Sequence, residues 1–355
     1  MSAQTSVRAY RPALDGLRIV AFGLVALYHL TTIEARYGDG NLLSPRLLLG
    51  VSGVDIFFVL SGFMMGQLFI GQPANRRPTP LRFLIDRASR LFPLYWAVSL
   101  ALLAVWLVQP DLVFGSRSET PDLIRSFLLW PADTAPLHAV GWTLVHLAFF
   151  YLVSAALLAL PRRWLWPALG IWAGFTLVLY AVGAGQWTAE TRLISHPLGL
   201  EYILGLALAL LPTPSPVRAR LLAIMAGMIM LTVAVGAALI DQDLRLLAPL
   251  QRVALLAPGP ALMIYALNAW THSQPSSRWL SLAGVARAGF ALYLTHILVM
   301  SVIGRIWSPF ALPGLLDNML MIPVMLIASL VAAMLTERLF ETPLARLIRQ
   351  LGPSR

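Results

Sequence analysis

The 355-residue chain has no lysine and no cysteine, and only 12% of its residues are charged. Without cysteine it cannot form a disulfide, a thiolate metal site, a thiol nucleophile or a palmitoylated anchor. Without lysine it cannot form a Schiff base. A typical soluble domain is about 25% charged, so the low charge and the 58% hydrophobic content exclude a soluble or disordered chain. A membrane protein with many spans remains.

Ten segments are long and apolar enough, or nearly so, to cross a bilayer, which takes about 20 residues each. The sequence therefore predicts an all-α polytopic membrane protein, a single bundle of ten transmembrane helices. The predicted spans are 14–33, 47–71, 91–108, 142–160, 164–184, 196–211, 220–240, 246–270, 288–307 and 315–336. The sixth is short, and Pro258-Gly259-Pro260 predicts a kink in the eighth. Asp15 and Arg18 at the start of the first span argue against a cleaved signal peptide.

The distribution of arginine predicts the orientation. Eighteen arginines fall at the two ends or in the even-numbered connections, and seven in the odd-numbered ones, which hold ten of the sixteen acids. Because cytoplasmic loops are enriched in basic residues, we expect both termini to be cytoplasmic. The net charge of +10 fits an anionic membrane surface better than nucleic acid.

Two segments outside the spans have helical character. The longest connection, 109–141, includes a stretch from Pro121 to Trp130 that predicts a short interfacial helix. Residues 337–350 alternate arginine with apolar residues, which predicts an amphipathic helix on the cytoplasmic leaflet. No internal repeat or linker divides the chain, so we expect one domain over 1–355.

Ionisable residues inside predicted spans are costly and mark candidate functional sites. They are Arg18, His29, Asp55, His146, Glu201, Arg252 and His296. At a rise of about 1.5 Å per helical residue, His29, Asp55 and His146 lie at similar depths, roughly 21–24 Å from the cytoplasmic ends of their spans. We therefore expect these three to lie in one cluster.

His29 is the leading candidate for a general base. It follows Arg18 by eleven residues, three helical turns, so the arginine lies at the cytoplasmic mouth and the histidine deep inside. A carboxylate fixes the tautomer of a histidine and raises its basicity, and Asp55 is the predicted partner. The alternative is a histidine that packs and hydrogen-bonds a nearby carbonyl.

Three further features allow two interpretations each. The glycines of 50–63 allow close helix packing, or the approach of a ligand beside Asp55. Arg87 and Arg90 lie on one helical face, where they can bind phosphates or simply reach the headgroups. Glu201 and Arg252 can form an ion pair or bind an acceptor.

Taken together, these motifs resemble the acyltransferase 3 family of integral-membrane O-acyltransferases, in the family's order and over nearly the whole chain. The matching blocks are Leu14–Arg18 with His29, Gly53–Phe63, Arg87-x-x-Arg90, Trp142–Leu144 with Phe150-Tyr151, Leu200–Gly205, Leu292–His296 and Glu341-x-Pro343-Leu344. Leu200–Gly205 is similar to a stretch found in members that modify exopolysaccharides.

The resemblance implies transfer of an acyl group, usually acetyl from acetyl-CoA, to a hydroxyl of an extracytoplasmic or lipid-linked glycan, with no metal, in the bacterial inner membrane. It implies that Arg18, Arg87 and Arg90 bind CoA. His29, oriented by Asp55, would deprotonate the hydroxyl or carry the acyl group covalently, with His296 as a second catalytic candidate. The residues expected to contact the substrate are Ser61, Trp142, His146, Tyr151, Glu201, Arg252 and Tyr293. Expected partners are the bilayer, the glycan acceptor, the polysaccharide biosynthesis or export machinery and a second copy of the chain.

One departure from the family pattern bears on activity. The family commonly has a glutamate five residues after the tryptophan of the Trp-Thr-Leu block, and this chain has Leu147. If that acid matters to the chemistry, the chain is impaired or depends on another group. Two other functions stay open: a glycolipid or polysaccharide transporter, which ten helices with buried charges also suit, and a non-catalytic scaffold of an export complex.

Overall fold

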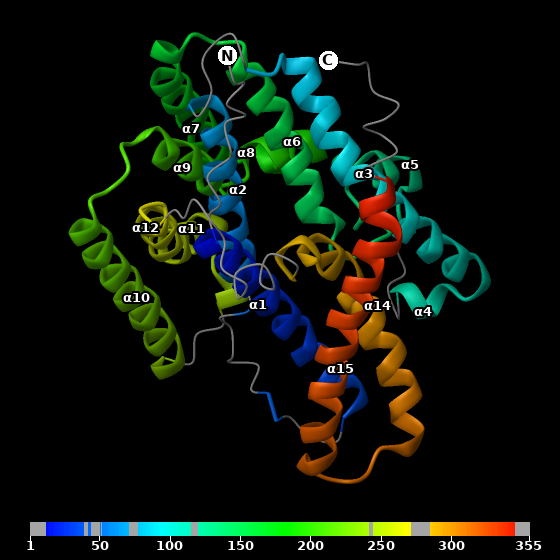
Figure 1. Ribbon diagram of the computed structural model, residues 1–355. Helices are drawn as coiled ribbons and strands as arrows, with labels where there is room; N and C mark the ends of the chain where they lie inside the picture. Colours follow the sequence, from blue (N-terminus) through cyan, green and yellow to red (C-terminus); the bar gives the residue numbers. More distant parts are fainter. Residues whose placement is uncertain are drawn as a thin grey trace, which may run out of the picture.

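The structure is a computed structural model that describes residues 12–38, 42, 43, 50, 52–70, 77–114, 120–240, 244–270 and 285–344. Throughout those ranges the regular structure is helical, with no strand (Figure 1). The α-helices are α1 (Pro12–Tyr37), α2 (Ser52–Ile70), α3 (Pro80–Val108), α4 (Pro110–Phe114), α5 (Leu123–Leu128), α6 (Gly141–Leu158), α7 (Leu165–Ala181), α8 (Ala189–Ser195), α9 (Leu198–Leu210), α10 (Pro216–Leu239), α11 (Pro249–Leu256), α12 (Pro258–Leu267), α14 (Gly289–Trp307) and α15 (Leu315–Thr336). Single 3₁₀ turns lie at Arg162–Trp164, Ala184–Gln186, Leu244–Leu246 and Ser308–Phe310.

The predicted bundle of membrane spans is confirmed. In the part of the chain that the structure describes, nine helices are long and apolar enough to cross a membrane, and the bent pair α8–α9 raises the number to ten. That pair, bent by 41°, is the short sixth span. The eighth span is divided as its prolines predicted: α11 ends at Leu256 and α12 begins at Pro258, because a proline ring has no N–H to continue a helix.

The third span starts earlier than the sequence predicted. Helix α3 begins at Pro80, where Thr79 accepts a hydrogen bond from the Arg82 backbone N–H and caps the helix. Proline at the first helical position already has a suitable φ, which favours a helix start there. Arg87 and Arg90 therefore lie within the helix, on one face, rather than near its first turn.

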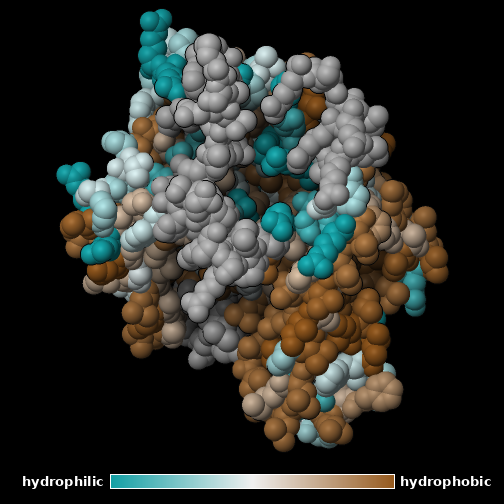
Figure 2. All heavy atoms as spheres, viewed as in Figure 1, coloured by the Kyte–Doolittle hydropathy of each residue, from teal (hydrophilic) through white to brown (hydrophobic). Residues whose placement is uncertain are grey.

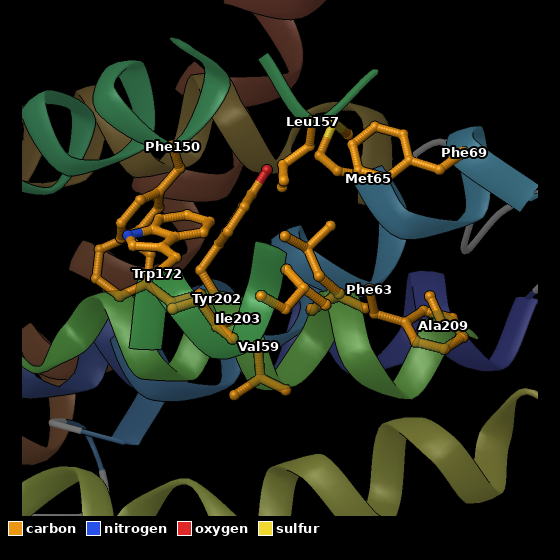
Figure 3. Packing of buried hydrophobic residues seen from close by; sticks show 14 of the residues in the cluster. Val59, Phe63, Met65, Phe69, Phe150, Leu157, Trp172, Tyr202, Ile203 and Ala209 are labelled. Atoms are coloured by element: carbon orange, nitrogen blue, oxygen red, sulfur yellow. The ribbon is translucent and has the colours of Figure 1, made fainter. Parts of the chain in front are cut away.

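The tightest helix crossing is between α2 and α9. A Cβ atom at Gly62 would overlap the Tyr202 carbonyl, and one at Gly205 would overlap the Val59 carbonyl. Glycine at both positions lets the two backbones touch, so close packing accounts for this part of the glycine-rich segment. In the neighbouring core, Tyr202 stacks on Phe150 of α6 with ring centroids 4.5 Å apart (Figure 3).

Helix α1 runs through the middle of the bundle, with α10 to α12 on one side and α14 and α15 on the other (Figure 1). Hydrophobic side chains cover the outer surface of α14 and α15, as expected for helices that face lipid (Figure 2). At one end of α1 the buried Glu34 accepts hydrogen bonds from Asn318 Nδ2 at 2.7 Å and from the Leu42 and Leu43 N–H groups. This polar link between α1 and α15 was not predicted from the sequence.

The two helices expected outside the spans are present as far as the structure describes them. Helix α5 lies within the stretch from Pro121 to Trp130. After α15 the chain continues through a π turn, Glu337–Glu341, and stays helical to residue 344. The rest of the predicted amphipathic helix, 345–350, lies outside the described residues.

Candidate active site

Two cavities in the helix bundle contain most of the predicted site residues. The first, which we call the histidine pocket, has a volume of about 690 Å³. Its lining includes His29, Trp142, His146, His196, Arg252 and Tyr293. The second, which we call the arginine pocket, has a volume of about 460 Å³. Its lining includes Arg18, Ser61, Arg87, Arg90, Leu147 and Tyr151.

The same helices line both pockets at different levels. On α1, Arg18 lines the arginine pocket and His29 the histidine pocket, and eleven residues of helix separate them by about 16 Å. On α6, Trp142 belongs to the histidine pocket and Tyr151 to the arginine pocket. On α1 the predicted division into an arginine end and a histidine end matches the two pockets, and α6 also reaches both.

Of the three residues expected to cluster, His29 and His146 line the histidine pocket and Asp55 does not. The histidine next to His29 is His296 of α14, which was expected at another depth. The ring centroids of His29 and His296 are 5.2 Å apart. His296 donates its Nδ1–H to the Leu292 carbonyl at 2.9 Å, because a carbonyl oxygen can only accept. Its Nε2 is buried and has no hydrogen-bond partner among the described residues. His296 thus holds an unused acceptor close to the His29 ring.

His146 of α6 makes the same kind of backbone contact as His296. Its Nδ1–H donates to the Trp142 carbonyl at 2.9 Å, and its Nε2 is buried without a described partner. The His196 ring lies edge-on to it, with centroids 5.1 Å apart. His196 was not among the predicted site residues, although its place at the start of the sixth apolar segment was a usable signal.

A second histidine that was not predicted, His138, joins the connection before α6 to α14. His138 is fully buried and donates its Nε2–H to the Leu294 carbonyl at 2.8 Å. The Val140 backbone N–H points to its Nδ1 at 3.4 Å. Burial disfavours the charged imidazolium and lowers the pKa of His138 from 6.5 to about 4. His138 is therefore neutral at pH 7 and fixed in one tautomer.

Asp55 binds Arg252 rather than His29. Arg252 of α11 donates from Nε to Asp55 Oδ1 at 3.0 Å and from Nη2 to Oδ2 at 2.8 Å, a two-point ion pair. Asp55 is fully buried, and an unpaired charge there would be strongly destabilising. The predicted pairing of Asp55 with His29 is therefore wrong. Both carboxylate oxygens of Asp55 accept hydrogen bonds from the Arg252 guanidinium instead.

Glu201 stands behind this ion pair. It is fully buried, and neither of its carboxyl oxygens accepts a hydrogen bond from a described group. Asp55 and Arg252 are close enough to interact with it electrostatically. The expected Glu201–Arg252 pair is therefore replaced by a group of three, in which Arg252 makes its two-point contact with Asp55. Glu201 lines neither pocket.

The three arginines expected to bind CoA do come together in the arginine pocket. Arg18 is paired with Asp15 at 3.2 Å. The Arg87 guanidinium lies over the Phe83 ring at 5.6 Å, and its buried Nε donates to no described group. Arg87 therefore has an unused donor beside the cavity that it lines.

Two residues of the arginine pocket were expected to contact the substrate. Ser61 and Tyr151, which the sequence analysis grouped with the acceptor-binding residues, line the arginine pocket instead. Leu147 follows His146 on α6 but also lines the arginine pocket, because consecutive helical residues point about 100° apart. A glutamate at 147 would therefore face the arginines and not the His29 imidazole.

A protein-family profile described as an acyltransferase domain matches residues 11–338. The chain belongs to the acyltransferase 3 family. Among the described residues of this acyltransferase 3 protein, no group of three His, Cys, Asp or Glu side chains is placed to hold a metal ion. The family recognised from the sequence motifs is thereby confirmed.

The chain is similar to several acyltransferase 3 relatives along much of its length. It is 28% identical to the exopolysaccharide production protein ExoZ of Rhizobium meliloti over 273 residues, 72% of this chain and 78% of ExoZ. It is 26% identical to the acyltransferase MdmB of Streptomyces mycarofaciens over 382 residues, 96% of this chain and 93% of MdmB. The peptidoglycan O-acetyltransferase OatA of Listeria monocytogenes is 28% identical over 210 residues, 57% of this chain and 28% of OatA. No solved structure matches the chain.

Proposed function

We propose that this protein is an acetyl-CoA-dependent O-acyltransferase of the bacterial inner membrane that acylates a hydroxyl of an extracytoplasmic or lipid-linked glycan. The observation that carries the proposal is the division of one transmembrane bundle into an arginine pocket and a histidine pocket, with Arg18 and His29 on the same helix. The excess of arginine in the even-numbered connections supports cytoplasmic termini, with the arginine pocket open to the cytoplasm.

The arginine pocket suits the donor. Acyl-CoA carries several phosphate groups, and guanidinium groups bind phosphate through two parallel hydrogen bonds. Arg87 contributes a buried Nε that donates to no described group, and Arg90 lies one turn away on the same face of α3. Arg18 reaches the same cavity from α1.

The histidine pocket suits the acceptor. Its volume of about 690 Å³ lies within the usual range for small-molecule sites, and rings such as Trp142 alternate with polar groups such as Arg252 along its lining. ExoZ is described as an exopolysaccharide production protein and OatA as a peptidoglycan O-acetyltransferase, which supports a glycan acceptor.

The proposed reaction uses His29 as the base. His29 takes the proton of the acceptor hydroxyl, whose oxygen attacks the thioester carbonyl. A carbon–oxygen bond forms, the carbon–sulfur bond breaks, and the CoA thiolate leaves and is protonated. His296 assists by offering its bare Nε2 as an acceptor to an N–H of His29, since catalytic hydrogen bonds often tighten only when substrate is bound. In a second version, His29 first carries the acyl group covalently.

The decisive experiment follows labelled acetyl groups from acetyl-CoA to a crude glycan fraction, with the purified protein in nanodiscs. Covalent label in the glycan that depends on His29 supports the proposal, and label trapped on protein without an acceptor identifies the covalent version. Uptake of glycan into proteoliposomes without covalent change would instead support a transporter. Arg163→Ala is the control for arginine variants, because Arg163 is exposed and lines neither pocket.

A further inference from the structure

Three aromatic rings separate the arginine pocket from the histidine pocket. They are Phe22 of α1, Phe57 of α2 and Tyr293 of α14, which we call the aromatic wall. The Phe22 ring lies 5.8 Å from that of Phe57 and 6.0 Å from that of Tyr293, and the Phe57 and Tyr293 rings stack at 6.3 Å with 6° between their planes. Each ring therefore touches the other two.

The aromatic wall is common to both cavities and is closed. Phe22 and Phe57 line the arginine pocket, and Tyr293 lines the histidine pocket. All three surround a small gap that they share with Val25 and Val54, and this gap has no room for a water molecule. An acyl group that passes directly between α1, α2 and α14 from the arginine pocket towards His29 therefore meets these rings.

We propose that the aromatic wall is an acyl-length filter that restricts this enzyme to short acyl donors. The inference rests on the proposed function, because it requires the donor in the arginine pocket and the reacting histidines beyond the wall. A closed stack of rings opens only as far as one ring can turn, and side chains turn between a few staggered positions. Such an opening fits an acetyl group more readily than a long alkyl chain.

The contacts of the three rings indicate that Phe57 is the ring that turns to open the wall. The Tyr293 hydroxyl donates a hydrogen bond to the Val140 carbonyl at 3.1 Å and also contacts the Thr143 hydroxyl, so this ring is held in place. Phe22 is seated against Gly289, where a Cβ atom would overlap its ring. Phe57 makes no hydrogen bond through its side chain and is only half-buried, with one side on the arginine pocket. Its size therefore sets the width of the passage.

Transfer rates with acyl-CoA donors of increasing length test the filter. Acetyl-, butanoyl-, hexanoyl- and octanoyl-CoA are compared with one acceptor, for the parent protein, Phe57→Ala and Phe57→Leu. In an apolar pocket, one methylene group more or less in the substrate changes kcat/KM by about tenfold or more. We expect Phe57→Ala to raise the ratio of hexanoyl to acetyl transfer by about that factor, and Phe57→Leu to raise it less. Phe57→Leu keeps the test decisive if the alanine variant fails to fold.

Phe290→Ala is the matched control. Phe290 lines the arginine pocket but not the gap at the aromatic wall, so its removal widens the donor cavity without opening the passage. We expect the chain-length ratio of Phe290→Ala to equal that of the parent. An unchanged ratio in both Phe57 variants, with acetyl transfer intact, would overturn the filter and leave the proposed function standing. A parent that transfers no acyl group from any donor would overturn the proposed function itself.

Discussion

The imidazole rings of His29 and His296 lie 5.2 Å apart, on helices α1 and α14, beside the histidine pocket. His29 lines that pocket, whereas His296 stands behind it with Nδ1–H fixed on the Leu292 carbonyl and Nε2 bare. His29 can therefore contact the substrate, and His296 can accept a proton or a hydrogen bond from His29.

We predict that His296→Ala lowers kcat by about tenfold or more, because His29 loses the acceptor that positions it. His296→Asn should retain more activity, since its side-chain oxygen is also an acceptor. The same assay on His146→Ala is the comparison: His146 has the same backbone contact, but its ring neighbour is His196. The pH profile of kcat should shift for the His296 variants only. If His296→Ala and His296→Asn both keep the pH profile of the parent, His296 does not position His29.

Arg87→Ala should raise the Kd for acetyl-CoA by about tenfold or more, because a hydrogen bond to a charged group contributes about 1.5–3 kcal/mol. Phosphate contacts act far from the reacting carbon, so kcat should change less than affinity. Equilibrium binding of labelled acetyl-CoA and steady-state kinetics measure the two effects, with Arg163→Ala as the control. Parental affinity combined with a collapsed kcat would show that Arg87 acts in the chemistry instead.

Breaking the buried ion pair should destabilise the fold. We predict that Asp55→Leu or Arg252→Met alone costs about 3–5 kcal/mol, because each leaves a buried charge without its partner. The double variant removes both charges and should cost clearly less than the sum of the two single changes. Unfolding in detergent, followed for all four proteins, gives the coupling energy. Simple additivity would mean that the pair does not act as a unit.

The free energy of unfolding should decrease as the pH is lowered, because His138 is buried in its neutral form. Its pKa is lowered from 6.5 in the unfolded chain to about 4, so between these values the unfolded state binds more protons. The contribution of His138 is complete above pH 6.5 and is lost as the pH falls to about 4, a change of about 3 kcal/mol. Thermal unfolding of the parent and His138→Gln at pH 7 and at pH 5 tests this. Equal slopes of Tm against pH would contradict the assignment.

Much of the fold could be predicted because a bilayer imposes length and apolarity on every span. The ten predicted segments correspond to helices of the structure, and even the break at Pro258 was readable from proline chemistry. The start of α3 at Pro80 was not, because the charged first turns of that helix lie outside the apolar segment.

Most of the predicted site residues line one of the two pockets, but the groups that they contact could not be predicted. Depth along a helix follows from counting, whereas the direction in which a side chain points depends on the packing of distant helices. Asp55 meets Arg252, 197 positions later in the chain, and this arrangement leaves no local signal. Leu147 directly follows His146 in the chain, yet it lines the arginine pocket and not the histidine pocket. His138 was missed because it lies in a connection.

The role of His29 is tested most directly by one assay: transfer of labelled acetyl from acetyl-CoA to glycan by the parent protein and by His29→Ala, both purified and both checked for acetyl-CoA binding. General-base catalysis contributes about 10²–10⁴-fold, so His29→Ala should lose at least about a hundredfold in transfer while it binds acetyl-CoA as the parent does. Parental transfer by His29→Ala would contradict the account and make His296 the next residue to test.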